Sequence, residues 1–530
     1  LPIALYIILA FGSPEFFMLS VLGLIMVGAV SGNAVSKGIA AATLGLMLSQ
    51  IGYPVASSVP RYWFHMPNLL DGLPLVPIVL GLFGIPEMMD LAARRSSIAH
   101  IDDSRADNDS ILNGIKEAIK NRWLVVRSAL LGVYIGMLPG IGSAVVDWLA
   151  YGHAVQSAKD KSNFGKGDIR GVIGPESANN AVLGGAIIPT ISFGIPGSGA
   201  MAILLGAMTI HGFAPGRDML TDNLDVTFSM VWTIIFANII GAAVLMMWGR
   251  QVARTAFVDG NLIVPAVVIF IFMGSWLWNP GLYTWIVLLG VGLGGYMMKA
   301  AGWPRPPFIL GFVLGPIIEN AMAITWQTYE PMEIIVRPQF LGLLAVVLVV
   351  GFFVIRSTRS NSEFQIETTV VSRASLQLST IMALALFAMF AGAIWMALDY
   401  KLLAKVSPIT IAAAGLLVAA MVIATDQFKL REFRKARAAG DAAAGGTFPE
   451  FVSEHKRQIL TFAAIAVMAF STQVLGTYGG LVGFAMAYVW IWGGFRWWVV
   501  LLYGAGATAF LYFLYDQVLH APFIDPIFMS

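Results

Sequence analysis

The chain contains no cysteine and little charge, and each shortage excludes a class of protein. Without cysteine it has neither a disulfide nor a thiolate metal site. Only 12% of its 530 residues are charged, where a typical soluble domain has about 25%, and 58% are hydrophobic. A net charge of +2 argues against a basic surface for nucleic acid. We therefore predict an all-α, polytopic membrane protein.

The signatures of common enzymes are also missing. None of the six histidines is followed by glutamate, which excludes the H-E-x-x-H zinc helix. Lys166 is followed by Gly167 and not by the Ser or Thr of a phosphate-binding loop. No Gly-x-Ser-x-Gly elbow supplies a nucleophile. We expect no catalytic residues, no metal and no cofactor, and an ion gradient as the source of energy.

Apolar segments near the length of a membrane span recur along the chain. A spanning helix needs about 20 mainly apolar residues. The predicted spans are 16–31, 37–52, 73–89, 226–248, 262–278, 282–298, 308–324, 340–355, 378–398, 409–424, 460–475, 481–493 and 497–514. The region between 123 and 213 adds shorter, broken segments.

The distribution of basic residues predicts which loops face the cytoplasm. Loops 249–260, 299–307, 356–376 and 426–457 carry two, two, three and seven Lys or Arg. The loops of the opposite side carry three in all, namely Arg337, Lys401 and Lys405. Because cytoplasmic loops are enriched in Lys and Arg, we place the first set, and the loop 90–122, in the cytoplasm.

Two membrane regions are expected. A polar segment, 357–377, interrupts the apolar pattern and is interpreted as a cytoplasmic linker. It separates a transporter domain, 1–356, from a smaller membrane module, 378–530. Because Leu1 is neither a start methionine nor part of a charged leader, we expect the chain to be a piece of a longer protein.

Two Pro-Gly pairs, Pro139-Gly140 and Pro196-Gly197, lie within apolar sequence and are followed by small residues. Proline removes a backbone donor, and glycine permits the angles of an unwound segment, so we predict two broken helices. The helix that restarts after each break points free N–H groups into a cavity, which suits an anion. The expected substrate-binding residues here are Pro139, Gly140, Gly142, Ser143, Pro196, Gly197 and Ser198.

A row of polar side chains lies between the breaks. Glu176, Asn179 and Asn180 are spaced i, i+3 and i+4, so they share one face of a helix. Polar groups in membrane segments are costly and mostly functional, so we expect Asn179 and Asn180 to contact the substrate. The alternative is that Glu176 is interfacial and that the two amides join helices.

Candidates for binding a coupling ion are Asp147, Glu176, Thr190 and Ser192. A carboxylate such as Asp147 could bind Na⁺ or carry a proton, or it could pair with a basic residue. The hydroxyls could coordinate a cation or satisfy local carbonyls. The sequence leaves these alternatives open.

Two long motifs carry a resemblance to a known family. They are LPGIGSAVVDWLAYG (138–152) and FGKGDIRGVIGPESANNAVLGGAIIPTISFGIPGSGAMAILLGAMTIHGFAPG (164–216). Together with FGSPEFF (11–17), GLFGIPE (81–87) and PPFILGFVLGPIIEN (306–320), they resemble the large membrane subunit of bacterial tripartite tricarboxylate transporters. The resemblance covers about 1–355, and the segment after 378 resembles that family's small membrane subunit more weakly.

The resemblance implies a bacterial inner-membrane secondary transporter coupled to Na⁺ or H⁺. It also implies a periplasmic substrate-binding protein that delivers citrate-like carboxylates, and an earlier half with its own Pro-Gly motifs upstream. Other partners to consider are a separate small membrane subunit and a second copy of the chain. The alternatives from other classes are an anion channel or scaffold without ion coupling, and an intramembrane hydrolase that uses Asp147 with Glu176.

Overall fold

The computed structural model describes residues 12–30, 34–54, 59–94, 111–137, 142–164, 167–196, 198–254, 258–278, 280–360, 373–438, 453 and 455–524. In these ranges the regular secondary structure is helical, apart from one isolated β-bridge between Gly52 and Arg61. Nine of the described helices are long and apolar enough to cross a membrane. The prediction of an all-α, polytopic fold is confirmed.

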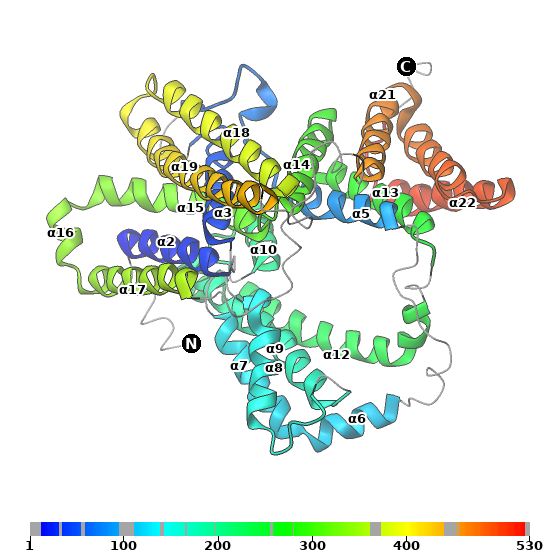
Figure 1. The fold of residues 1–530 in the computed structure, drawn as a ribbon, viewed down its shortest axis with the longest axis horizontal. Coiled ribbons are helices and arrows are strands. Elements are labelled where there is room, and N and C mark those ends of the chain that lie inside the picture. The colour runs from blue at the N-terminus through cyan, green and yellow to red at the C-terminus, as the bar shows by residue number, and fades with distance from the viewer. Residues whose placement is uncertain are drawn as a thin grey trace.

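Figure 1 shows the order and arrangement of the helices. In chain order the main helices are α2 (Ser13–Val30), α3 (Val35–Leu48), α4 (Leu75–Val79), α5 (Ile85–Arg94), α6 (Ile111–Lys120), α7 (Arg122–Gly136), α8 (Gly142–Ser157), α9 (Arg170–Phe193), α10 (Gly199–Ile210), α11 (Arg217–Leu220), α12 (Leu224–Arg254), α13 (Gly260–Trp278), α14 (Leu282–Ala300), α15 (Pro306–Thr328), α16 (Pro331–Val336), α17 (Pro338–Ser360), α18 (Arg373–Ala397), α19 (Leu402–Ala438), α21 (Lys456–Ile491) and α22 (Trp497–Phe510). A π-helical turn, Leu80–Gly84, joins α4 to α5 into one span.

The ends of some spans differ from the predicted ones. Helix α17 continues to Ser360 and α18 begins at Arg373, so both ends of the predicted linker 357–377 are helical. The middle of that linker lies outside the described residues. Helix α21 contains Gly476 in the left-handed region (φ 73°), and a side chain at Gly480 would come within 2.8 Å of the Thr472 Cα. The chain therefore folds back at Gly476, and the two predicted spans 460–475 and 481–493 are both present.

Small residues bring α3 and α15 into backbone contact. A Cβ atom on Gly45 would lie 2.0 Å from the carbonyl oxygen of Phe308, and one on Gly311 would lie 2.1 Å from that of Ala42. Such close approach is how helices associate in lipid, where apolar burial alone gives little driving force. Helix α2 packs against the same two helices, so α2, α3 and α15 form one group of helices.

Helices α7, α8 and α9 form a second group. A Cβ on Gly132 would lie 2.3 Å from the Ala178 oxygen, and one on Gly136 would lie 2.2 Å from the Val182 oxygen. A step of four residues on α7 therefore matches a step of four on α9, so these two helices run parallel. A Cβ on Gly174 would contact both Ser128 near the start of α7 and Ala154 near the end of α8. Helix α8 therefore runs back along α7.

The first break is thus a reversal of the chain. At 15 and 16 residues, α7 and α8 are about 22 and 24 Å long, which is less than the roughly 30 Å of a hydrocarbon core. We interpret them as a re-entrant hairpin that enters the bilayer and leaves on the same side. The residues at its tip, 138–141, lie outside the described part of the chain.

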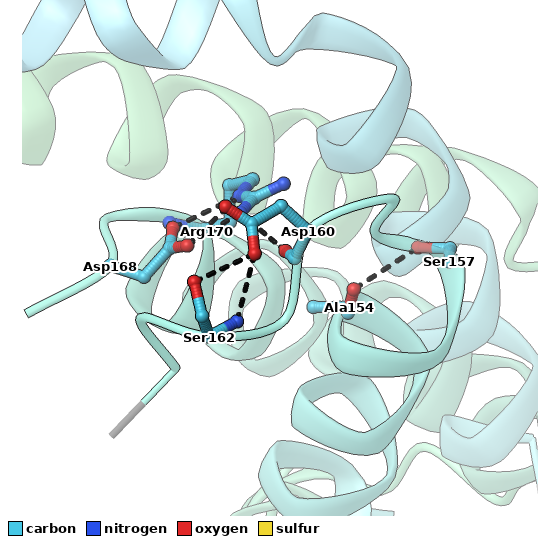
Figure 2. A network of polar contacts seen from close by, with 6 residues as sticks. All are labelled: Ala154, Ser157, Asp160, Ser162, Asp168 and Arg170. Carbon is cyan, nitrogen blue, oxygen red and sulfur yellow. Dashed lines mark hydrogen bonds and ion pairs between the residues drawn. The ribbon is translucent and has the colours of Figure 1, made fainter. Parts of the chain in front are cut away.

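A polar network closes the loop between α8 and α9 (Figure 2). The Arg170 guanidinium donates to both carboxylate oxygens of Asp168 and, at 2.9 Å, to the carbonyl oxygen of Asp160. The Ser162 hydroxyl and backbone N–H donate to the Asp160 carboxylate at 2.7 and 3.0 Å. These bonds tie the start of α9 to the loop that follows α8.

The C-terminal helices pack at two different places. In Figure 1, α18 and α19 lie beside α3 and α15, whereas α21 and α22 lie at the other end, beside α5 and α13. The first pair shares a hydrophobic core with α3 and α15, and the second shares another core with α5, α13 and α14. The division of the chain into domains 1–356 and 378–530 stays a prediction.

Ion pairs join loops that were expected on the same side of the membrane. Lys299 lies 2.9 Å from Glu87 and 2.6 Å from Asp90, and all three belong to the predicted cytoplasmic side. Arg337, on the opposite side by prediction, pairs at 2.7 Å with Glu15 at the start of α2. These contacts agree with the alternation that the basic residues predict.

Candidate functional site

The second break separates α9 from α10. Helix α9 ends at Phe193, and Gly194 adopts a left-handed conformation (φ 68°) that favours glycine. Buried Ile195 and Pro196 follow, and α10 begins at Gly199. At about 36 Å, α9 is long enough to cross the bilayer by itself, so the break lies at the end of a crossing and not halfway along it.

Ser198 caps the N-terminus of α10. Its backbone is extended and its Oγ accepts the N–H of Met201 at 3.3 Å. The first N–H groups of α10 have no partner within the helix, and they carry the positive end of the helix dipole. Because the Ser198 hydroxyl accepts from Met201, its own hydrogen is still available to donate to a ligand. This helix end has the chemistry of an anion site.

After α10 the chain returns to the end of α9. The N–H of Gly216 donates to the Ile191 oxygen at 2.8 Å, and a Cβ on Gly194 would lie 2.8 Å from the Pro215 ring. Helix α10 has 12 residues and is about 18 Å long, too short to span. Residues 194–216 thus form an excursion that leaves the end of α9 and comes back to it.

A cavity of about 740 Å³ lies beside this excursion. Its walls come from the start of α2, the segment before α4, the end of α9, the second half of α10, residues 212–215 and one face of α15. The polar and aromatic residues that line it are Ser13, Phe16, Asn68, Asp71, Phe193, Thr209, Phe213, Trp278, Tyr283, Phe312 and Asn320.

The lining of the cavity is mainly apolar, and Asp71 is its charged member among the described residues. The walls therefore supply no cation for a carboxylate. The free N–H groups at the start of α10 are a source of positive potential, and they lie at the other end of that helix from the residues that line the cavity. Asn68 and Asp71 are exposed, so the cavity is reached from the side on which the loop 59–74 lies.

The predicted residues of the first break are only partly described. Pro139 and Gly140 lie outside the described residues, as does Gly197 of the second break. Gly142 and Ser143 form the first turn of α8, which begins where the sequence predicts. The side chain of Ser143 is not among those described.

The predicted polar row and the second break are far apart. Glu176, Asn179 and Asn180 are exposed on α9, on a face that turns away from the buried Ala178 and Val182. From Asn180 to Phe193 the helix rises by about 20 Å. A single small carboxylate cannot touch both the amides and the break in this conformation.

The candidates for ion binding divide in the same way. Thr190 and Ser192 are buried in the last turn of α9, and the Thr190 hydroxyl donates to the Ala186 oxygen at 2.7 Å. Glu176 is about 21 Å below Thr190 along the helix, so the two cannot bind one ion together. On α8, the Oδ1 atom of Asp147 is buried and has no hydrogen-bond partner in the described structure.

The sequence analysis missed a buried polar cluster around Arg61. Arg61 is fully buried and pairs with Glu319 of α15, and it donates to the Gln50 oxygen at 2.6 Å. The same oxygen accepts from Ser407 of α19 at 2.9 Å. The available signal was Glu319 itself, an isolated carboxylate within the apolar span 308–324.

The chain is similar to proteins of a known transport family. Residues 1–310 match the tripartite tricarboxylate transporter TctA family. An uncharacterized 52.8 kDa protein in the TAR-I ttuC' 3' region of Agrobacterium vitis is 29% identical over 355 residues, which are 64% of this chain and 67% of the relative. An uncharacterized protein in the TAR-II ttuC' 3' region of the same organism is 32% identical over 193 residues, 36% of this chain and 78% of the relative.

No solved structure matches the chain. The family match covers more than half of the sequence, and it includes both helix breaks, the polar row and all of α14. Transport, and not enzymatic catalysis, is the activity of this family, as the missing enzyme motifs led us to expect. The protein is therefore a multi-pass membrane protein that belongs to the tripartite tricarboxylate transporter TctA family.

Proposed function

We propose that this chain is the permease subunit of a secondary transporter for tricarboxylates or related carboxylates, driven by a Na⁺ or H⁺ gradient. The family supports a membrane component of a tripartite system. The substrate, the coupling ion and the residues that bind them are the proposed part.

One observation carries the proposal: the excursion 194–216 begins at a helix N-terminus capped by Ser198, and the second half of the same helix, α10, lines a cavity of about 740 Å³. Free N–H groups at a helix end favour an anion. The described residues that line the cavity include no Lys or Arg that could bind a carboxylate instead. A carboxylate would be held there by the backbone of α10 and by the hydroxyl of Ser198. The hydroxyls of Thr190 and Ser192, which are buried in the last turn before the break, would bind the coupling cation.

The polar row on α9 has a separate role in this proposal. Because Asn179 and Asn180 are about 20 Å from the break, they would line the path that the substrate takes towards the cytoplasm. Glu176 and the unpartnered Asp147 would be met on the same path. Alternating access would open first the end of α9 and then the face that carries the amides.

The proposed partners follow from the side on which the cavity opens. Exposed Asn68 and Asp71 belong to a loop that the charge distribution places outside the cytoplasm. A soluble substrate-binding protein in the periplasm would deliver the carboxylate there, with the permease in the bacterial inner membrane. A small membrane subunit or a second copy of the chain would complete the complex.

The test is uptake of labelled citrate into proteoliposomes that hold the assembled transporter with this chain in it, with its binding protein outside. We expect accumulation above the outside concentration when an inward Na⁺ or H⁺ gradient is imposed, and none without it. Ser198→Ala should lower the uptake, whereas Ser471→Ala should not, because the Ser471 hydroxyl bonds only within its own helix in the described structure. Citrate that merely equilibrates, with or without a gradient, would identify an anion channel instead.

A further inference from the structure

A buried polar network lies at the cytoplasmic end of the α18–α19 hairpin. Asp426 of α19 is 1% exposed, and its carboxylate lies 3.8 Å from the Lys37 ammonium at the start of α3. Ser379 of α18 donates to the same carboxylate and accepts from the Trp303 indole N–H at 2.9 Å. Lys37 also donates to the Ala301 oxygen at 3.0 Å. Each group from the hairpin therefore meets a partner on α3 or on the turn before α15.

A second network lies at the opposite end of the same hairpin. The backbone N–H of Tyr62 donates to the Tyr400 hydroxyl at 3.0 Å, and the Tyr62 hydroxyl donates to the Ala393 oxygen at 3.0 Å. The Ser407 hydroxyl donates to the side-chain oxygen of Gln50, just after the end of α3. The same oxygen accepts a hydrogen bond from Arg61. Both ends of the hairpin thus contact residues between 37 and 62, by an ion pair to Lys37 at one end and by hydrogen bonds to Gln50 and Tyr62 at the other.

Between the two networks the contact is apolar and close. Ala412, Ala419 and Val422 of α19 are fully buried in the core that they share with α3 and α15. Apolar residues in a membrane have no strong preference for protein over lipid, so this surface fixes neither the partner nor its position along α3. Unpaired buried charges at the ends would be costly, and this cost gives the interface its selectivity.

We propose that α3 and the turn before α15 form a docking surface that selects a two-helix membrane partner by a carboxylate at the partner's cytoplasmic end. In this chain the partner is the α18–α19 hairpin, and Asp426 is the selecting residue. The hairpin binds as an independent unit, without help from α21 and α22, which bury their apolar surface in a different core. Lys37 would thus accept such a hairpin even when it is a separate polypeptide.

The experiment uses the full chain with one protease site inserted between Ser360 and Arg373 and a second one in the segment 439–452. After purification in mild detergent through a tag on the N-terminal part, both sites are cut, and the retained fraction of the hairpin is measured. We expect nearly all of the hairpin to stay bound in the unmodified chain. Asp426→Ala should lower the retained fraction at least tenfold, and Gln427→Ala, an exposed neighbour, should leave it unchanged.

The charge swap Lys37→Asp with Asp426→Lys provides the second variant. It should restore retention relative to Asp426→Ala, because the pair is rebuilt with reversed signs. Loss of the hairpin from the unmodified chain after cutting would overturn the independent docking. Full retention of the hairpin in the Asp426→Ala variant would overturn the selecting role of the carboxylate. The same conclusion would follow if the charge-swap variant retained no larger fraction of the hairpin than Asp426→Ala does.

Discussion

Two regions of the molecule treat their polar groups in opposite ways. Around α3 and α15 the buried charges are paired: Arg61 with Glu319, and Lys37 with Asp426. On α9 the polar row stays exposed, and α10 begins at a capped N-terminus and lines a cavity with its second half. Paired groups inside a membrane protein stabilise one arrangement, whereas unpaired ones are available to a ligand or to a second conformation. We call the first region, α3 and α15 with their paired charges, the frame; the second region carries the residues proposed to bind the substrate.

The largest expected effect lies in the frame. Arg61→Ala leaves Glu319 buried without its partner, which should lower the free energy of unfolding by about 3–5 kcal/mol. Thermal unfolding of the purified protein in detergent measures this. Lys401→Ala, at an exposed position, is the control, and replacing both Arg61 and Glu319 with Met should recover most of the loss. If Arg61→Ala unfolds at the same temperature as the unmodified chain, the pair of Arg61 with Glu319 does not stabilise the frame.

The next effect distinguishes the polar row from the frame. Asn179→Ala or Asn180→Ala should lower uptake at least tenfold, about 1.4 kcal/mol, with an unchanged amount of folded protein, because an exposed amide is lost and no packing is disturbed. Asn238→Ala is the matched control, since the amide of Asn238 bonds to its own helix on α12. If both variants transport normally, the row is not part of the path.

A smaller effect separates the second break from an ordinary proline kink. Pro196→Ala removes the rigid residue before the start of α10 and lets this helix begin earlier, which shifts its free N–H groups, so the KM for the carboxylate should rise roughly two- to fivefold, the effect of a helix dipole contact. Pro265→Ala, within the buried part of α13, should change KM less. Initial uptake rates across substrate concentrations give both values. If both substitutions change KM by the same factor, the second break is an ordinary proline kink and takes no part in binding the carboxylate.

The smallest effect is expected at the loop between α8 and α9. Hydrogen bonds from Arg170 lower the pKa of Asp168 below its ordinary 3.8, so this contact stabilises the loop above that pH and is lost as the pH falls through the lowered pKa. Because the pair is at the surface, Asp168→Asn should leave the unfolding temperature at pH 7 unchanged. It should still speed tryptic cleavage at Lys159 or Lys161. Cleavage at the rate of the unmodified chain would mean that the network does not hold the loop.

The sequence predicted what local chemistry determines. Pro196 and the glycines around it limit the backbone by themselves, so the second break could be placed to within a few residues. The end of α9 at Gly194, two residues earlier, reflects a glycine in the left-handed region next to Pro215. The restart of α8 at Gly142 was likewise readable from small residues after a Pro-Gly pair.

Contacts between distant segments could not be predicted in the same way. Arg61 and Glu319 are 258 residues apart, and nothing near either residue specifies the other. The direction of α8 was also hidden, because the contacts of Gly174 with both Ser128 and Ala154 decide it and not the break itself. The 20 Å between the polar row and the second break follows from the straightness of α9, which continues through Pro175 and Pro189.

The return of the chain from α10 to Ile191 bears on how many times this part of the chain crosses the membrane. The loops 95–110 and 249–260 are both predicted on the cytoplasmic side, so the number of crossings between them must be even. The α7–α8 hairpin leaves on the side where it enters and counts zero, and α9 and α12 count one each. The hydrogen bond from the Gly216 N–H to the Ile191 oxygen brings the chain back to the end of α9, so the α10 excursion adds no crossing. The total is then two, which is even. With this count, the α7–α8 hairpin would enter from the cytoplasmic face and the α10 excursion from the opposite face.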